Sequence, residues 1–171
     1  MISTADAAAP VAVPSAHDFR DAMARVASAA HLVTTAGAGG RAGLTATAVA
    51  SVSDAPPTVL VCVSAGSRTL AAIEANGVFC VNTLAEADRE LAAVFAGQRG
   101  LFGEARFGAG QWRALTTGAP ALASALAAFD CRLVATHAVA THRILIGEVV
   151  GLGGGGAGPG LIYRERHFGA A

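Results

Sequence analysis

The apolar positions of this chain recur mainly in the patterns of β-strands. Short runs rich in valine, threonine, isoleucine and phenylalanine lie between breaks that contain glycine or proline, and such runs are typical of strands. The glycine-rich residues 37–40 predict a turn that joins the first two strands as a hairpin. So many short strands with few helices favour a mainly β fold with a closed or nearly closed β-barrel. The predicted strands cover residues 31–36, 43–53, 58–64, 78–84, 127–139, 141–152 and 161–163.

Short helices are predicted where polar caps precede apolar residues at helical spacing. Ser15 and Asp18 form a pair that resembles a capping box, and the apolar residues of this first helix extend to residue 30. Ser67 can cap a second helix, which Gly77 is placed to end. A second capping-box pattern, at residues 83–86, begins a third helix.

Length and charge limit the classes of function. With 171 residues the chain fits one domain, assigned to residues 17–171 after a flexible, proline-interrupted tail at residues 1–16. The formal charge is zero, and the basic residues are twelve scattered arginines without a lysine. The sequence therefore lacks the basic stripe that would indicate nucleic acid or an anionic membrane as a partner. The least charged long stretch, residues 114–129, is broken by glycine and proline and is too short to span a bilayer.

The cysteines indicate the redox compartment. Cys62, Cys80 and Cys131 lie far apart without Cys-x-x-Cys spacing, and two of them fall within apolar, strand-like runs. An odd number of separated cysteines is typical of reduced, buried thiols. Because reduced thiols are the rule inside cells, the pattern predicts a cytoplasmic protein.

The histidines show no metal-ligand spacing. His17 and His31 are interpreted as caps or surface residues, and His137 falls in a strand with no ligand partner nearby, so no metal site is predicted. His142 lies at the end of a strand, where an isolated histidine is usually a surface residue. No Ser/His/Asp set or pair of carboxylates suggests nucleophilic or acid–base catalysis.

Hydroxyl side chains recur along the predicted strand at residues 43–53. Thr45, Thr47, Ser51 and Ser53 share parity, and successive side chains of a straight strand point to opposite faces. One face would then carry these hydroxyls, between alanines small enough for a flat ring or a phosphate to approach the backbone. A solvent-facing strand explains the same spacing, and a bulge would change the parity.

Glycine-rich segments resemble nucleotide-binding motifs only in part. Residues 37–42 read Gly-x-Gly-x-x-Ala, but a strand follows where a dinucleotide fingerprint needs a helix, and residues 151–160 lack the Lys-Ser/Thr of a P-loop. Ser67, Arg68 and Thr69 differ, because free N–H groups, a hydroxyl and a guanidinium at a helix start can converge on a phosphate. A capped helix with a solvated arginine is the alternative.

Several short motifs after residue 17 occur in an order and at a spacing that resemble one family. The segment at residues 43–64 is followed by Gly66-Ser67-Arg68-Thr69, Asn76-Gly77-Val78-Phe79-Cys80-Val81-Asn82-Thr83-Leu84, Phe95-Ala96-Gly97, Arg106-Phe107, Thr117-Gly118-Ala119-Pro120, Thr141-His142, Ile146-Gly147-Glu148-Val149 and Leu161-Ile162-Tyr163. This series resembles the short-chain flavin reductases that serve two-component monooxygenases. The resemblance implies the split β-barrel of FMN-binding proteins.

The resemblance also implies a function. It implies hydride transfer from NADH or NADPH to FMN or FAD, by a homodimer that supplies reduced flavin to a separate flavin-dependent oxygenase. His142 is implied as the catalytic residue that binds the nicotinamide, although Ala140 and Thr141 replace the Gly-Asp that often precedes it in the family. The implied flavin-binding residues are Thr45, Ala46, Thr47, Ala48, Ser51, Val52, Cys62, Val63, Ser64, Ser67, Arg68, Thr69, Phe95, Ala96, Gly97, Arg106 and Tyr163.

The same residues are compatible with other functions. Members of the same family that reduce a cobalt corrinoid or support pyrimidine breakdown would carry the same motifs. A flavin- or tetrapyrrole-binding module without turnover is an alternative of another class, because nothing in the residues alone requires catalysis.

Overall fold

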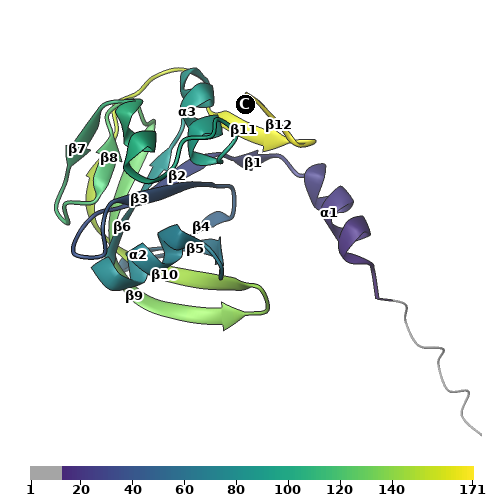
Figure 1. Cartoon of the computed structure of the whole chain (residues 1–171), viewed down its shortest axis with the longest axis horizontal. Helices are drawn as coiled ribbons and strands as arrows, with labels where there is room; N and C mark the ends of the chain where they lie inside the picture. The colour runs from purple at the N-terminus through teal and green to yellow at the C-terminus, as the bar shows by residue number, and fades with distance from the viewer. Residues whose placement is uncertain (1–12) are drawn as a thin grey trace, which may run out of the picture.

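The computed structural model describes residues 13–171, so most of the predicted tail at residues 1–16 lies outside the described residues. The centre of the fold is a seven-stranded antiparallel sheet (Figure 1). The mainly β prediction is confirmed, and the two predicted long strands appear as β9 and β10. In spatial order the strands are β3 (Ala42–Ala46), β2 (His31–Thr35), β6 (Val78–Thr83), β9 (Ala127–Val139), β10 (His142–Gly153), β5 (Pro57–Ser64) and β4 (Val49–Asp54).

The two edge strands of this sheet, β3 and β4, are consecutive in the chain and are separated only by Thr47 and Ala48. The sheet curls so that this link lies against β5, where the backbone N–H of Cys62 donates to the carbonyl of Ala48 at 2.9 Å. Within residues 13–171 no ladder joins β3 directly to β4. The sheet is therefore a nearly closed, split barrel, as the sequence predicts.

Two smaller sheets combine the predicted strand at residues 161–163, which is β11, with four strands that the sequence pattern does not predict. One contains β1 (Ser28–Ala29), β11 (Leu161–Arg164) and β12 (His167–Ala170); the other pairs β7 (Trp112–Ala114) with β8 (Pro120–Leu122). The turn between β11 and β12 places Glu165 at φ 50° and Arg166 at φ 63°. Such hairpin turns usually carry Asn-Gly, so this Glu-Arg turn gives no sequence signal.

The helices differ from prediction mainly at their ends. Helix α1 (Ala16–Ala24) begins after Ser15, whose hydroxyl accepts from the Asp18 N–H at 3.1 Å, but it ends before the predicted residue 30. Helix α2 (Arg68–Asn76) ends at Gly77 with φ 67°, as predicted. The sequence predicts a loop at residues 98–110, and within it a 3₁₀ helix forms at Gly103–Gly108 (η2).

The third helix does not begin at the predicted capping box at residues 83–86. A 3₁₀ turn, η1 (Glu86–Asp88), precedes α3 (Arg89–Phe95), and the Asp88 carboxylate accepts from the Ala85 N–H at 3.1 Å. Asp88 therefore supplies the local cap that the pattern assigns to Thr83 and Glu86. The apolar residues Leu91, Val94 and Phe95 of α3 are buried, as its spacing predicts.

Apolar clusters fill both faces of β2. Val33 packs with Phe79 and Ile73 beneath α2, whereas the neighbouring Leu32 packs with Phe95 and other residues of α3. This alternation follows from the two-residue period of a strand. The thiols are free, with Cys80 and Cys131 buried and Cys62 half-buried. Burial, with a smaller effect of the Asp130 carboxylate, raises the pKa of Cys131 to about 12 and also raises that of Cys80.

His31 is buried, which corrects its interpretation as a cap or surface residue. Its side chain is 8% exposed, and its Nδ1 lies 3.1 Å from the Thr83 hydroxyl. Burial lowers the pKa of His31 to about 4, because a charged imidazole loses its hydration there. His17 is exposed, as predicted, and His137 is exposed on β9.

This burial predicts a pH-dependent stability. As pH falls from 6.5 toward 4, the unfolded chain binds a proton at His31 that the folded chain does not, so folding becomes less favourable. We expect this residue to lower the free energy of unfolding at pH 5 by about 2 kcal/mol relative to pH 8. Urea titrations of wild type and His31→Gln at several pH values measure it. The loss should be smaller in the variant, and parallel curves would contradict the prediction.

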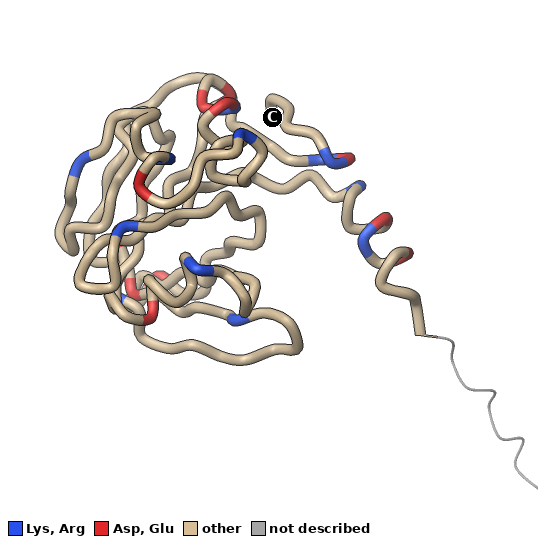
Figure 2. Tube along the Cα trace, viewed as in Figure 1, with Lys and Arg blue, Asp and Glu red and all other residues tan. Residues whose placement is uncertain are grey.

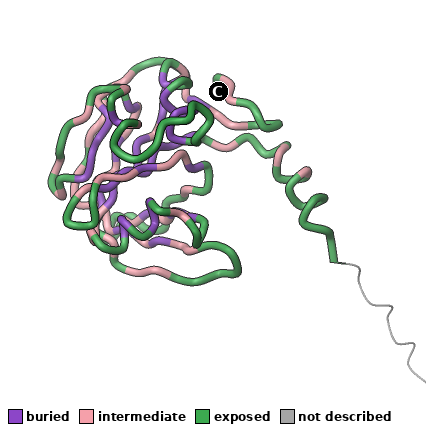
Figure 3. The backbone as a smooth tube through the Cα atoms, viewed as in Figure 1, coloured by how far each residue is buried: buried purple, intermediate pink, exposed green. Residues whose placement is uncertain are grey.

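Helix α1 protrudes from the body of the molecule (Figure 1), and none of its residues is buried. Figure 3 shows most of α1 as exposed, and Phe19, Met23 and the adjacent Val26 are exposed large apolar side chains. In residues 13–171 the charged residues are scattered without a basic stripe (Figure 2). None of the helices in residues 13–171 has the length and apolar character that crossing a membrane requires.

Candidate functional site

Most of the predicted site residues meet in a pocket of about 380 Å³ at the split of the barrel, which we name the central pocket. Its walls come from the end of β3, the link to β4, the end of β5, the residue before α2, the end of α3 and the start of β10. The lining residues are Leu44, Thr45, Ala46, Thr47, Ala48, Cys62, Val63, Ser64, Ser67, Phe95, Ala96 and His142.

Strand register brings these residues together. His142, the first residue of β10, lies opposite Ser64, the last residue of β5, so both are at one end of the barrel. The link between β3 and β4 is held against Cys62 at the same end. Because Ala48 and Ala96 carry only methyl groups, the wall leaves space for a flat ligand. The volume is in the range of small-molecule sites.

The predicted row of hydroxyls is wrong as a continuous surface. The predicted strand is interrupted between β3 and β4, and the register of β4 with β5 shifts at Val52, between Ser51 and Ser53. Ser51 and Ser53 line a separate apolar groove, so neither of them, nor Val52, lines the central pocket. Thr45 lines the pocket, but its hydroxyl donates to the Ala92 carbonyl at 2.7 Å. Thr45 therefore also anchors α3 to β3.

A second pocket, of about 390 Å³, adjoins the central pocket, and we name it the arginine pocket. It shares Leu44 and Ser67 with the central pocket, so one ligand can extend through both. Its lining residues are Ala42, Gly43, Leu44, Ser67, Arg68, Thr69, Phe102, Gly103 and Arg106.

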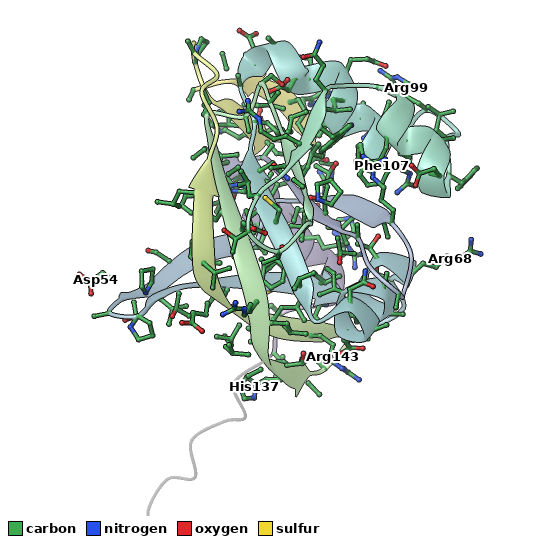
Figure 4. The ribbon with its side chains drawn as sticks, turned by 90° about the vertical axis from the view of Figure 1, so that its left-hand side faces the viewer. Asp54, Arg68, Arg99, Phe107, His137 and Arg143 are labelled. Atoms are coloured by element: carbon green, nitrogen blue, oxygen red, sulfur yellow. The ribbon has the colours of Figure 1, made fainter. Side chains whose placement is uncertain are left out.

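The start of α2 gives the arginine pocket its anion-binding groups. Ser67 precedes the helix, but its hydroxyl makes no capping hydrogen bond, so this hydroxyl is free for a ligand. Arg68 extends outward at the helix start, on the side of the molecule that carries Phe107 (Figure 4), and its side chain makes no ion pair or hydrogen bond within residues 13–171. Backbone N–H groups of the first helical turn complete a set suited to a phosphate.

Three of the predicted flavin-binding residues, Thr69, Arg106 and Gly97, have structural roles within the protein. The buried Thr69 hydroxyl donates to the Gly43 carbonyl at 3.1 Å, and the Arg106 guanidinium donates to backbone carbonyls. Gly97 lines none of these pockets, and its φ of 80° is typical of the residue that follows the end of a helix, here α3.

His142 has a hydroxyl partner in place of the family's acidic one. Its Nδ1 lies 3.0 Å from the Thr141 hydroxyl, so this hydroxyl can orient the ring. Ala140 adopts φ 47° at the tip of the β9–β10 hairpin, a conformation that glycine adopts without strain. The Ala-Thr pair thus preserves the turn and a polar partner.

Tyr163 lies beside the central pocket. It lines a hollow of about 190 Å³ with Phe168, and their ring centroids are 5.1 Å apart. Thr45, Thr47 and Ala96 line both this hollow and the central pocket. The pocket residues that sequence reasoning missed are Ala42, Gly43, Leu44, Gln98, Phe102, Gly103 and Phe168. Of these, Phe168 lies on the unpredicted strand β12, and Gln98, Phe102 and Gly103 lie in the segment treated as a loop.

The arrangement suits binding of a flat, phosphorylated molecule. The central pocket is open and lined by small side chains, and the adjoining pocket supplies a guanidinium, a hydroxyl and helix N–H groups. The described residues hold no cluster of three or more His, Cys, Asp or Glu side chains placed to bind a metal ion. Space for a flat ring and groups that can bind a phosphate are what these two pockets offer a ligand.

Comparison with known proteins agrees with this geometry. Residues 23–171 match the model of the flavin reductase like domain. A relative from Methylorubrum extorquens, "FMN reductase (NADH) RutF 1", is 50% identical over 168 residues, which cover 98% of this chain and 81% of the relative.

Solved structures show the same fold. BorF, the flavin reductase component of a bacterial two-component tryptophan halogenase, has a TM-score of 0.83 at 26% identity and covers 91% of this chain and 98% of its own. The NADH:FAD oxidoreductase SgcE6 of Streptomyces globisporus, in complex with NAD and FAD fragments, has a TM-score of 0.83 at 25% identity. The match covers 95% of this chain and 97% of SgcE6. The chain therefore belongs to the family of proteins with a flavin reductase like domain.

Proposed function

We propose that this protein is an NADH:flavin oxidoreductase that binds the flavin ring in the central pocket and the flavin phosphate in the arginine pocket. The contiguity of the two pockets is the observation that carries this assignment, because an FMN molecule joins a flat ring to a phosphate through a short chain. The free Ser67 hydroxyl lies where the two pockets meet, and Arg68 is at the phosphate end.

The reaction fits what the site lacks as well as what it holds. Hydride transfer from a nicotinamide to a flavin needs two stacked rings and little help from a protein acid or base. The described lining residues of the central pocket include His142 as their one titratable group besides the Cys62 thiol. In this proposal His142, which lines the central pocket, binds the nicotinamide end of the hydride donor beside the flavin.

The relatives support the choice of substrates. FMN and NADH are the substrates in the name of the M. extorquens relative, and NAD and FAD fragments are bound in the SgcE6 structure. We therefore take FMN as the preferred flavin and NADH as the preferred donor.

Steady-state assays test this function. Purified protein mixed with NADH and excess FMN should consume NADH over many turnovers, measured as loss of absorbance of the reduced nicotinamide. NADPH and FAD should be used less well. Binding of flavin without turnover would contradict the enzyme and favour a flavin-binding module.

The reduced flavin has a consumer in this proposal. BorF is the reductase component of a two-component system, so we infer that reduced FMN passes from this protein to a separate flavin-dependent oxygenase. We place the protein in the cytoplasm, which its free Cys80 and Cys131 support because buried thiols persist in a reducing compartment.

A homodimer is expected, because each chain exposes apolar surface that a second copy can cover. Phe19 and Met23 of α1 are 61% and 48% exposed, and the groove on β4, β5 and β10 has an apolar lining around Val59 and Leu152. Isolated helices as short as α1 are marginal without packing. Light scattering at micromolar concentration should give twice the chain mass, and the double variant Phe19→Ser/Met23→Ser should shift toward the monomer. A wild-type monomer that retains activity would contradict the dimer.

A further inference from the structure

Arg106 lies where three segments that form the two pockets come together. Its Nε donates to the Leu101 carbonyl at 2.9 Å, and its Nη1 donates to the carbonyls of Phe95 at 3.3 Å and Gly43 at 3.2 Å. Gly43 belongs to β3, Phe95 ends α3, and Leu101 precedes η2. One half-buried guanidinium thus joins the strand, the helix end and the loop at residues 98–110.

The Gly43 carbonyl ties a fourth element to this junction. It also accepts a hydrogen bond from the buried Thr69 hydroxyl in the first turn of α2, at 3.1 Å. Gly43 itself has no room for a side chain, because an added Cβ would lie 2.6 Å from the Phe95 ring. Gly43, Thr69, Phe95 and Arg106 therefore form a close-packed junction, and all four residues line the central or the arginine pocket.

The contacts of Arg106 differ in kind from those of Arg68. The guanidinium of Arg106 is directed at protein carbonyls, including one at the C-terminus of α3, where the helix carries partial negative charge. Arg68 makes no such contacts within residues 13–171. A phosphate anchor needs donors free for the ligand. Arg106 uses Nε and Nη1 on Leu101, Gly43 and Phe95, which leaves only the Nη2 donors of its guanidinium without a partner in the described residues.

We propose that Arg106 is a positioning residue, which holds β3, the end of α3 and the loop at residues 98–110 at the spacing that one flavin needs to occupy both pockets. The proposal rests on the function proposed above, which assigns the pockets to a flavin. The planar fork of arginine reaches carbonyls on separate segments at once, and the single ammonium of lysine does not. A positive charge at residue 106 is therefore not sufficient to hold the three segments at this spacing.

The test compares FMN with riboflavin, which has the same ring but no phosphate. In Arg106→Lys and Arg106→Ala, we expect KM to rise about five- to tenfold for both flavins, because spacing of the whole site is lost. The ratio of the KM values for riboflavin and FMN should stay at its wild-type value. Arg99→Ala is the matched control, since Arg99 is exposed on the same loop and pairs with Glu90; its KM values should not change.

Two outcomes would overturn the proposal. A loss confined to FMN that lysine restores would make Arg106 a phosphate anchor. A lowered melting temperature with unchanged KM for both flavins would make its role purely structural. If Arg106→Ala fails to fold, Arg106→Lys decides. Quenching of flavin fluorescence gives Kd for both flavins without turnover, so the proposal stays testable if the NADH assay fails and the proposed activity is wrong.

Discussion

Replacing Arg68 by alanine should raise KM for FMN by about ten- to hundredfold. The reason is that a hydrogen bond to a charged group contributes a net free energy of about 1.5–3 kcal/mol. Arg68, the first residue of α2, lines the arginine pocket, and its side chain has no protein partner in the described chain. All of its donors are therefore free for a phosphate, whereas Arg106 uses Nε and Nη1 on backbone carbonyls. The value of kcat at saturating FMN should change little, since the ring pocket is intact.

The flavin lacking the phosphate isolates this effect. KM for riboflavin should be the same in wild type and Arg68→Ala, and Arg68→Lys should keep part of the FMN preference because it keeps the charge. Arg132→Ala, which removes an exposed arginine on β9, is the matched control for net charge. An equal loss for FMN and riboflavin, or none for either, would remove Arg68 from the phosphate site.

The fold could be predicted where local signals are strong. β9 and β10 are long, and the chain around Gly77 carries a clear helix stop, so these elements appear close to their expected bounds. The three-residue strands β7 and β8 carry too few residues for a period to show. β12 is preceded by a Glu-Arg turn that no common turn signature covers.

The site could be predicted only in part, for a physical reason. The parity argument for the hydroxyl-rich segment assumes a straight strand, but the chain changes direction at Thr47 and Ala48 and bulges at Val52. The proximity of His142 to Ser64 depends on the register of β10 with β5, which no local pattern contains. The resemblance to flavin reductases therefore carried most of the residues that the structure brings together in the central pocket.

Arg106 shows a related limit. A basic residue beside a predicted phosphate site suggests a ligand contact, and the sequence has no means to show that backbone carbonyls of distant segments already bind its Nε and Nη1 donors. His31 is a second case, because its burial arises from packing around β2 and not from its neighbours in the chain.

Replacing His142 by alanine should lower kcat/KM for NADH at least about tenfold while leaving flavin affinity unchanged, since positioning of two rings dominates this reaction. His142 lies at the rim of the central pocket, opposite Ser64, and is exposed to an entering donor. Its Nδ1 contact with the Thr141 hydroxyl, at 3.0 Å, fixes one ring edge. Thr141→Val should therefore produce a smaller loss of the same kind.

His137→Ala provides the matched control, because His137 is exposed on the adjacent strand β9 of the same hairpin but lines none of the pockets that form the site. Stopped-flow reduction of bound FMN, followed over a full titration of NADH, separates binding of the donor from the hydride step. A lower apparent affinity for NADH in His142→Ala, with the control unchanged, would place the histidine at the nicotinamide. Equal reduction rates at every NADH concentration would make His142 a surface residue. The nicotinamide would then have to be held by other polar groups of the central pocket, such as the hydroxyls of Thr47 and Ser64.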